Sequence, residues 1–175
     1  IALVEKMELL VLDECKPDVV RIVAGKCCLE THGSLRFRDL QTSLDLREAP
    51  DALLGRAFMK KQGWRSWTAL KVGFSKQNWG TIFYALLRKY NMPGVDFVLK
   101  RPIPNLTGFQ ERPASFSDAL HGTRLVMVTE IGMTPEEACL YSEHSWRHVI
   151  ITAGRQLKTP LTRDQQNAIG HWTEN

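Results

Sequence analysis

Apolar residues recur at helical spacing along most of this chain. The spacing predicts helices over residues 2–14 and 17–30, and Pro17 and Asp18 are residue types that suit the first turn of the second helix. The same spacing predicts further helices over residues 78–90, 115–128, 134–141, 142–156 and 162–169. The pattern therefore indicates a mainly helical protein.

Two of these helices also carry start signals. Thr134 precedes Glu137 by three residues, which is the spacing of a capping box, and Pro135 stands in the first helical position. Thr162 and Gln165 repeat this spacing before the last helix. The two signals predict where these helices begin.

The pattern changes to that of a strand pair over residues 54–73. Apolar positions lie on both sides of Gln62–Gly63, a turn dipeptide, so the segment is predicted to be a β-hairpin. Residues 35–40 alternate between apolar and basic types and indicate either the end of a helix or the start of a strand. Residues 91–113 hold four prolines and two glycines and are expected to form a loop. The predicted fold class is mainly α with a small antiparallel sheet, an α+β arrangement.

Length and composition are those of an ordinary globular domain. The chain has 175 residues, which fits one domain, and 43% of them are apolar and 24% charged. The net charge of +4 is compatible with DNA binding but does not establish it. No stretch approaches the roughly 18 apolar residues of a membrane span, and residues 1–12 are too charged for a signal-peptide core. No membrane partner and no secretion are therefore expected.

The cysteines give no sign of a metal site. Cys15, Cys27, Cys28 and Cys139 form no C-x-x-C pair and have no regular spacing. Neither a zinc site nor a disulfide framework is indicated, and free thiols in a reducing compartment are the expected state.

Candidate chemistry lies in the last third of the chain. His144 and Arg147 stand three residues apart in a predicted helix, so their side chains can reach one ligand. The arginine presents a planar fork for two phosphate oxygens. His171 follows in the sequence Ile169-Gly170-His171 and can donate to another oxygen. Together the three side chains predict a site that holds one phosphate, although an H-x-x-R pattern alone also arises by chance.

The order of these residues resembles the catalytic core of the tyrosine recombinases, the phage-integrase-like enzymes that exchange DNA strands. Residues 142–154 resemble the family's H-x-L-R-H-T-x-A-T box, with Trp146 in place of the usual leucine. Lys61 and Gly63 resemble its K-T-G hairpin, and residues 35–40 resemble its L-R-W-x-D-I segment. The similarity is closest to recombinases of eukaryotic mobile elements of the DIRS and Crypton kind.

The resemblance implies a tyrosine-recombinase-like catalytic domain that needs no metal and no cofactor. In the family a tyrosine attacks a phosphate of double-stranded DNA, forms a 3′-phosphotyrosyl bond and releases a 5′-hydroxyl. By resemblance, Arg147 would be the second of two charge-stabilising arginines, with His144 beside it. His171 would be the later phosphate donor and Lys61 the general acid. The family works as a tetramer on two duplexes, so double-stranded DNA and further copies of the chain are the implied partners.

The lysine assignment leaves an alternative open. Lys60 competes with Lys61, because one residue of register in a strand turns the side chain to the other face. We prefer Lys61, which directly precedes the Gln62–Gly63 turn. Basic residues on and after this hairpin either contact DNA phosphates or are simply solvated. Trp64 and Trp67 in the same hairpin are expected in the core.

The first arginine is the point where the resemblance fails. Family spacing places it on Cys28, and a thiol cannot supply the charge of a guanidinium. Arg36, Arg38 or Arg21 could take its place. Arg36 is preferred for its position in the conserved segment, although Arg36 and Arg38 could equally form an exposed basic edge.

The nucleophile is the second departure from the family pattern. Tyr84, Tyr90 and Tyr141 all precede His171, whereas the family's tyrosine follows the later histidine. The chain is therefore expected to be a fragment of a longer recombinase, without the tyrosine segment and without the N-terminal DNA-clamping domain. Such a protein would work in the nucleus of a eukaryote and otherwise in the cytoplasm. Two other interpretations stay open: an inactive DNA-binding remnant of a mobile-element integrase, which Cys28 favours, and a helical interaction module unrelated to DNA.

Overall fold

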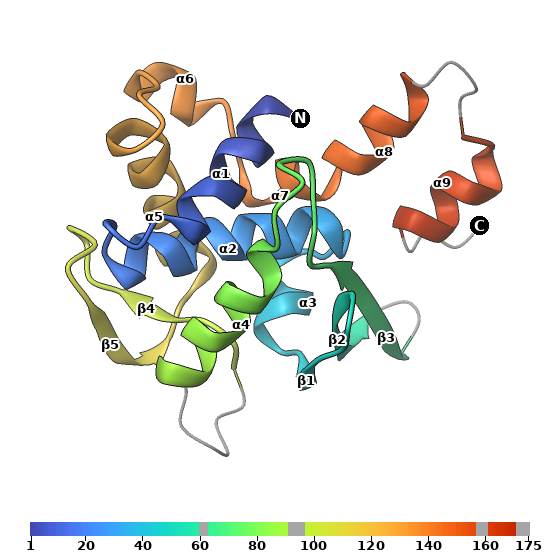
Figure 1. Ribbon diagram of the computed structural model, residues 1–175, viewed down its shortest axis with the longest axis horizontal. Coiled ribbons are helices and arrows are strands. Elements are labelled where there is room, and N and C mark those ends of the chain that lie inside the picture. Colours follow the sequence, from blue (N-terminus) through green and yellow to red (C-terminus); the bar gives the residue numbers. More distant parts are fainter. Residues whose placement is uncertain (60–62, 91–96, 157–160, 171–175) are drawn as a thin grey trace.

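The fold is arranged around one central helix, α2 (Asp18–His32), which crosses the middle of the molecule (Figure 1). The computed structural model describes four parts of the chain, residues 1–59, 63–90, 97–156 and 161–170. Every residue from Val19 to Thr31 is buried, so other elements cover α2 on all sides. Much of that cover comes from three helices that pack against it, α1 (Ala2–Leu12), α4 (Trp79–Tyr90) and α5 (Phe116–Thr129).

The turn between the first two helices follows from the side chain of one residue. Asp13 leaves the helical conformation, with ψ at 99°, and its Oδ1 accepts a hydrogen bond from the backbone N–H of Cys15 at 3.0 Å. Aspartate favours such turns because its carboxylate can replace a helical acceptor. For this reason α1 ends at Leu12 and not at residue 14, and Pro17 is the residue before the first turn of α2.

The predicted hairpin is confirmed and belongs to a three-stranded antiparallel sheet. Strands β2 (Ala52–Met59) and β3 (Gly63–Leu70) pair along their whole length, and Met59 opposite Gly63 is the last pair before the turn. Gly63 has φ at +70°, a conformation that glycine adopts without steric cost. Strand β1 (Leu44–Glu48), which the apolar pattern did not predict, pairs with β2 on its other side.

The expectation that both tryptophans of the hairpin are buried is wrong for one of them. Trp67 is 2% exposed and its Nε1 donates to Ser43 Oγ at 2.9 Å, whereas Trp64 is 53% exposed. The two residues are three positions apart in a strand, so their side chains point to opposite faces of the sheet. Trp64 instead packs edge-on against Phe58, its partner on β2, with ring centroids 5.8 Å apart.

The expectation that residues 91–113 form a loop is also wrong in part. Strands β4 (Lys100–Pro102) and β5 (Phe109–Pro113) form a second antiparallel hairpin. Its prolines stand at strand ends in a sheet of only two strands, where a missing N–H costs little. The buried side chain of Gln41 fixes the base of this hairpin: its amide donates to the carbonyl oxygens of Leu99 at 2.8 Å and Ala114 at 3.0 Å, and its Oε1 accepts from the N–H of Leu99 at 2.7 Å.

The remaining helices confirm the predicted ones with one change. Residues 35–40 lead into the short helix α3 (Phe37–Gln41). The predicted helix over 142–156 is divided at His148, whose N–H bonds to the carbonyl of Ser145, only three residues back, at 3.2 Å. This tightening separates two consecutive helices. The helices of this region are α6 (Pro135–Cys139), α7 (Glu143–Arg147), α8 (Val149–Arg155) and α9 (Arg163–Gly170).

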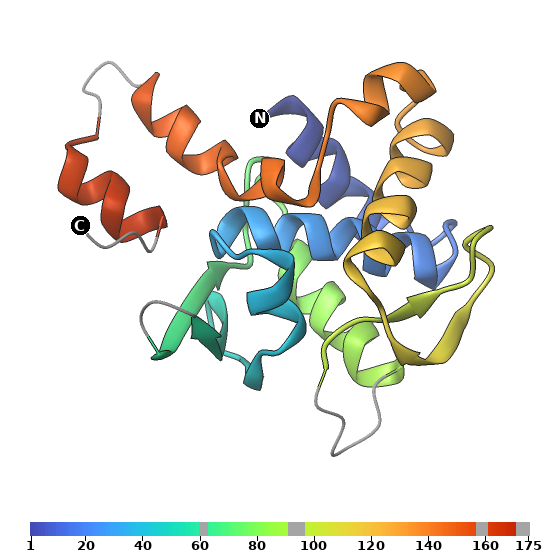
Figure 2. The same ribbon diagram turned by 180° about the vertical axis from the view of Figure 1, so that it is seen from behind.

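The predicted capping boxes are both present. The Thr134 hydroxyl accepts from the N–H of Glu137 at 3.2 Å, and the Glu137 carboxylate accepts from the N–H of Thr134 at 2.8 Å. Thr162 and Gln165 make the same reciprocal pair at 3.3 and 2.9 Å. Seen from behind, α8 and α9 extend away from the central helices to one edge of the molecule (Figure 2). The predicted α+β class is confirmed, and none of the helices in the described ranges is long and apolar enough to cross a membrane.

A buried carboxylate ties the first helix to the rest of the core. Glu8 on α1 has no exposed surface; it pairs with His32 Nε2 at 2.7 Å and accepts from the backbone N–H groups of Phe74 at 3.0 Å and Ser75 at 2.7 Å. Burial alone would raise the pKa of Glu8, but the hydrogen bonds from His32 and Ser75 outweigh it and lower the pKa. The ionised carboxylate is therefore the form that the fold favours.

Close packing between α2 and α4 predicts a strong effect of one methyl group. A Cβ atom on Gly25 would lie 2.1 Å from Cδ2 of Phe83, so Gly25→Ala should lower the free energy of unfolding by roughly 1–3 kcal/mol. Gly122→Ala is the matched control in α5, because its Cβ would meet no atom closer than 3.5 Å. There the better helix propensity of alanine should raise stability by about 0.5–1 kcal/mol. Urea unfolding of both variants measures the difference, and equal effects would contradict the packing described.

The Glu8 hydrogen bonds predict a pH-dependent contribution to stability. Because the folded-state pKa lies below the ordinary glutamate value of 4.5, the contribution is complete above that pH and is lost as pH falls through the lowered folded-state pKa. Glu8→Gln should destabilise the protein by about 1.5–3 kcal/mol at pH 7, and the difference from the unmodified chain should shrink on acidification. Thermal unfolding from pH 7 to pH 3 checks this. Glu5→Gln, an exposed site on the same helix, should show no such convergence.

Candidate phosphate-binding site

Helix α7 presents both residues of the H-x-x-R motif. Arg147 is 4% exposed and His144 is exposed, and their spacing of three places them on one side of the helix. Partial burial and the charges of Arg147 and Arg36 lower the pKa of His144. The ring is therefore mostly neutral at pH 7.

The charge of a second guanidinium acts on both residues from another part of the chain. Arg36 is exposed at the N-cap of α3. Burial lowers the pKa of Arg147, and the charge of Arg36 lowers it further, while Asp39 acts in the opposite direction. Charges influence one another in this way over roughly 10 Å in salt solution. Three of the predicted residues, Arg36, His144 and Arg147, therefore lie within electrostatic range of one another, and we call them the basic cluster.

The other two predicted site residues cannot be placed. Lys61 and its competitor Lys60, like His171, lie outside the described residues. The hairpin whose turn carries Lys61 is confirmed by the pairing of β2 with β3. The roles of Lys61 and His171 stay predictions.

The alternatives for the first arginine differ in their surroundings. Cys28 has no exposed surface and lies in the hydrophobic core on α2. Arg21 is held at the junction of α1 and α2, where its Nε donates to the carbonyl of Val11 at 2.9 Å and its Nη1 pairs with Asp18 at 3.3 Å. Arg36, by contrast, acts electrostatically on Arg147 and His144. These surroundings favour Arg36 over Arg21 as the partner of Arg147.

His148, which the sequence patterns did not single out, also contacts the basic cluster. His148 follows Arg147 directly, and its Nε2 lies 2.9 Å from Nε2 of His144, with the two rings edge to face at a centroid distance of 4.6 Å. Its pKa is lowered by partial burial first and then by the charges of His144 and Arg147. The spacing of four residues from His144 was the available signal, because such residues are neighbours on a helix.

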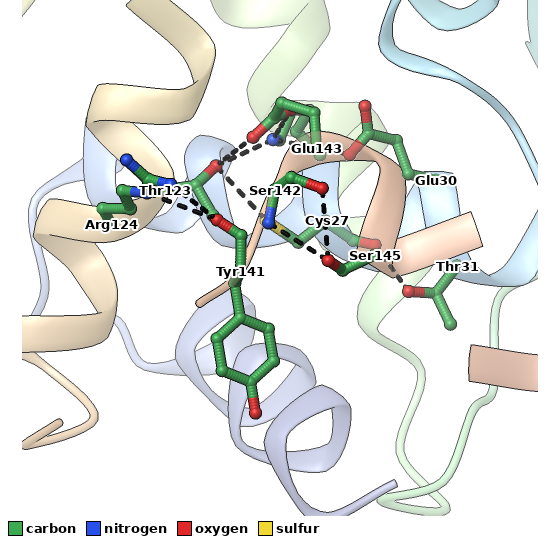
Figure 3. A network of polar contacts seen from close by, with 10 residues as sticks. Cys27, Glu30, Thr31, Thr123, Arg124, Tyr141, Ser142, Glu143 and Ser145 are labelled. Carbon is green, nitrogen blue, oxygen red and sulfur yellow. Dashed lines mark hydrogen bonds and ion pairs between the residues drawn. The ribbon is translucent and has the colours of Figure 1, made fainter. Parts of the chain in front are cut away.

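A buried polar network fixes α7 to the central helix (Figure 3). Lys26 on α2 is 1% exposed; its Nζ donates to the carboxylate of Glu143 and to Thr123 Oγ1 at 2.8 Å. Thr123 on α5 in turn donates to Glu143 Oε1 at 2.9 Å. Glu143 is the first residue of α7 and precedes His144. Contacts among three helices therefore set the position of the H-x-x-R motif.

The network concentrates charge where water is absent. Glu30 lies one turn after Lys26, with its Oε2 at 3.4 Å from Lys26 Nζ. Burial raises the pKa of Glu30 well above its usual range, although the charge of Lys26 acts in the opposite direction. Burial opposes the charge of Lys26, yet its acidic neighbours outweigh burial and raise its pKa. Lys26 therefore stays charged and holds Glu143 as a buried ion pair.

Arg124 fixes the chain that leads into α7. Its Nη2 donates to the carbonyl oxygens of Cys139 at 2.9 Å and Tyr141 at 3.0 Å, and Figure 3 shows the second of these contacts beside the network. Ser142 is the N-cap of α7, and its backbone N–H donates to Ser145 Oγ at 3.1 Å. The N-terminal end of α7 is thus held by side chains of both α2 and α5.

Comparisons with protein-family models, with curated proteins and with solved structures return no match to this chain. Function must therefore be inferred from the side chains themselves.

The buried ion pair predicts a large loss of stability on removal of its cation. Lys26→Met would leave the Glu143 carboxylate without its cation in a water-free site, which should lower the free energy of unfolding by roughly 3–5 kcal/mol. Denaturant unfolding measures this loss.

Lys89→Met is the matched control, since Lys89 pairs with Asp18 at 2.6 Å but is 64% exposed. An exposed pair of this kind contributes far less than a buried one, because solvent screens the two charges. An equal loss of unfolding free energy in both variants would show that the Lys26 network does not fix α7 in place.

Proposed function

We propose that this chain supplies the phosphate-binding part of a tyrosine-recombinase-like domain, which breaks and rejoins double-stranded DNA through a 3′-phosphotyrosyl intermediate. The observation that carries the proposal is the basic cluster. Arg36 comes from the start of α3, and His144 and Arg147 come from α7, yet the charge of Arg36 acts on both. His144 and Arg147 belong to the segment that resembles the family's H-x-L-R-H box, and Arg36 stands in the segment that resembles its L-R-W-x-D-I box.

The arrangement suits an anion better than it suits the protein alone. The charge of Arg36 lowers the pKa of Arg147, so the two guanidinium groups repel one another, and the Lys26 network holds the helix that carries Arg147 in place. A phosphate between them would remove this repulsion and accept charge-assisted hydrogen bonds from both forks. Donors fixed in advance around a phosphate stabilise the extra negative charge of a phosphoryl-transfer transition state.

The nucleophile is not assigned to a tyrosine of this chain. The hydroxyl of Tyr90 donates to Asp18 at 2.9 Å, and burial and this bond raise the pKa of Tyr90, which makes it a poor nucleophile. Tyr141 packs against Trp146 with ring centroids 6.4 Å apart. Lys61 as general acid, His171 as a further donor and a tetramer on DNA belong to the proposal as predictions from the resemblance.

The inactive-remnant alternative rests on Cys28, which stands at the expected position of the first arginine and is fully buried in the core. The proposal therefore depends on Arg36, which would supply the missing guanidinium from a different segment.

Duplex DNA binding tests the proposal. Fluorescence anisotropy with a labelled duplex should show affinity that falls with rising salt concentration. Arg36→Ala should weaken binding by roughly tenfold. It should also reduce the slope of log affinity against log salt concentration by about 1, the value for one lost phosphate contact. Arg38→Ala, an exposed site two residues along in α3, is the matched control and should change affinity far less. No salt-dependent binding of the unmodified chain would overturn the proposal.

A double-mutant cycle tests whether both arginines bind the same phosphate. Arg147→Gln should weaken duplex binding on its own, and its effect should be smaller in the Arg36→Ala background, because a shared ligand couples the two residues. Circular dichroism of Arg147→Gln confirms that the variant is folded. If the losses of affinity in the two single variants simply add in the double variant, the arginines bind separate phosphates and the proposal of one shared site is wrong.

A further inference from the structure

The junction between α7 and α8 places two imidazole rings in direct contact beside the basic cluster. His144 Nε2 and His148 Nε2 are 2.9 Å apart, and the edge-to-face arrangement of the rings suits one shared hydrogen. His148 ends α7 and starts α8, so its backbone is fixed by both helices. The contact therefore restrains His144, an exposed side chain that would otherwise rotate freely.

A single shared hydrogen limits the protonation states of the pair. If His148 donates, the neutral ring of His144 carries its own hydrogen on Nδ1 and can donate it to a ligand. If His144 donates, its Nδ1 has no hydrogen and repels an anion. One added proton places hydrogens on both Nδ1 atoms and keeps the shared one between the Nε2 atoms. A second added proton would break the contact.

The charges around the pair are mostly positive. Arg147 on α7, Arg36 at the start of α3 and Arg155 on α8 all act on His148, while Asp39 on α3 acts on Arg147 in the opposite sense. Arg155 is also held by Gln166 of α9, to which its Nε donates at 3.0 Å. The charged groups of α2 nearest to α7 are Lys26 and Glu30, which face Glu143. Without an anion, these surroundings disfavour a proton on the pair, and a bound phosphate reverses that preference.

We propose that His148 is a positioning residue, which holds His144 through their shared hydrogen bond so that Nδ1 of His144 donates to a phosphate, and which couples phosphate binding to the uptake of at most one proton. This inference rests on the proposed function, because it assigns the phosphate to the basic cluster. His148 itself acts through His144.

Two substitutions of His148 separate hydrogen bonding from packing. His148→Gln keeps a group that can donate to or accept from Nε2 of His144, whereas His148→Phe keeps a ring but loses the hydrogen bond. For duplex DNA binding at pH 8, His148→Phe should weaken affinity by roughly three- to tenfold, the cost of ordering one free side chain. His148→Gln should restore affinity to near that of the unmodified chain. The reverse order, with Phe tolerated and Gln harmful, would show a packing role and overturn the proposal.

The pH profile is the second measurement. Affinity of the unmodified chain for the duplex should rise as pH falls from 8 to 6, by at most about tenfold per pH unit, the limit for one linked proton. In His148→Phe the rise in affinity should occur at lower pH, because protonated His144 can no longer donate a hydrogen bond to Nε2 of His148. His121→Gln is the control, since His121 contacts the carbonyl of Pro104 at 3.2 Å and should leave the profile unchanged. An unmodified chain whose affinity does not depend on pH would overturn the coupling.

Imidazole ¹⁵N chemical shifts of the full chain without DNA separate this inference from the proposed function. They should show one shared hydrogen between His144 and His148, and the pattern should disappear in His148→Phe. If the pair behaves in this way but the duplex does not bind, the proposed function fails and the coupling to phosphate fails with it. If the duplex binds and the shared hydrogen is absent, the function stands and the positioning role of His148 is wrong.

Discussion

The buried ion pair between Lys26 and Glu143 is the contact on which the geometry of the basic cluster depends. A charged lysine inside a protein is costly unless a carboxylate and further hydrogen bonds surround it, and here Glu143, Thr123 and Glu30 do so. The pair joins the most deeply buried helix to the first residue of α7. Hydrophobic packing alone would allow α7 to slide or rotate, whereas a buried ion pair is satisfied in few arrangements.

Charged side chains near the basic cluster fall into two groups, one in which opposite charges are paired and one in which positive charges predominate. In the interior, the charge of Lys26 is paired with the carboxylate of Glu143, and this pair helps to fix the position of α7. In the basic cluster, the charge of exposed Arg36 lowers the pKa of buried Arg147, and His144 and His148 also have lowered pKa values. A protein gains no stability from such an arrangement of like charges by itself. This contrast is why the cluster points to an anionic ligand and the interior network does not.

The sequence predicted the features that depend on local pattern. Apolar spacing located the helices, and the Thr134 capping box and the turn at Gly63 were correct because each depends on residues that are close in sequence. The second hairpin was missed because its prolines suggested a loop, and its pairing depends on the side chain of Gln41, far away in the chain. Trp64 was placed in the core because its apolar character was considered without the alternation of a strand.

The sequence indicated which residues form the candidate site, but not which contacts hold them in position. The H-x-x-R motif identified His144 and Arg147, and the choice of Arg36 agrees with its effect on both. No pattern along the sequence could reveal that Lys26 supports α7, because a lysine in an apolar helix is usually assigned to a solvated face. His148 could have been found from its spacing to His144 alone.

The distance in sequence between the two halves of the basic cluster has a consequence for how the protein matures. Arg36 lies in the first quarter of the chain, while the contact that positions α7 joins residues 117 positions apart. Long-range contacts of this kind form late in folding, since the chain entropy lost in closing a large loop must be recovered by packing. During synthesis, the first two-thirds of the chain can assemble helices and both hairpins with only one arginine of the cluster present. On the proposed function, a chain that has not yet docked its last third would lack the complete phosphate site and would therefore not compete with finished chains for nucleic acid.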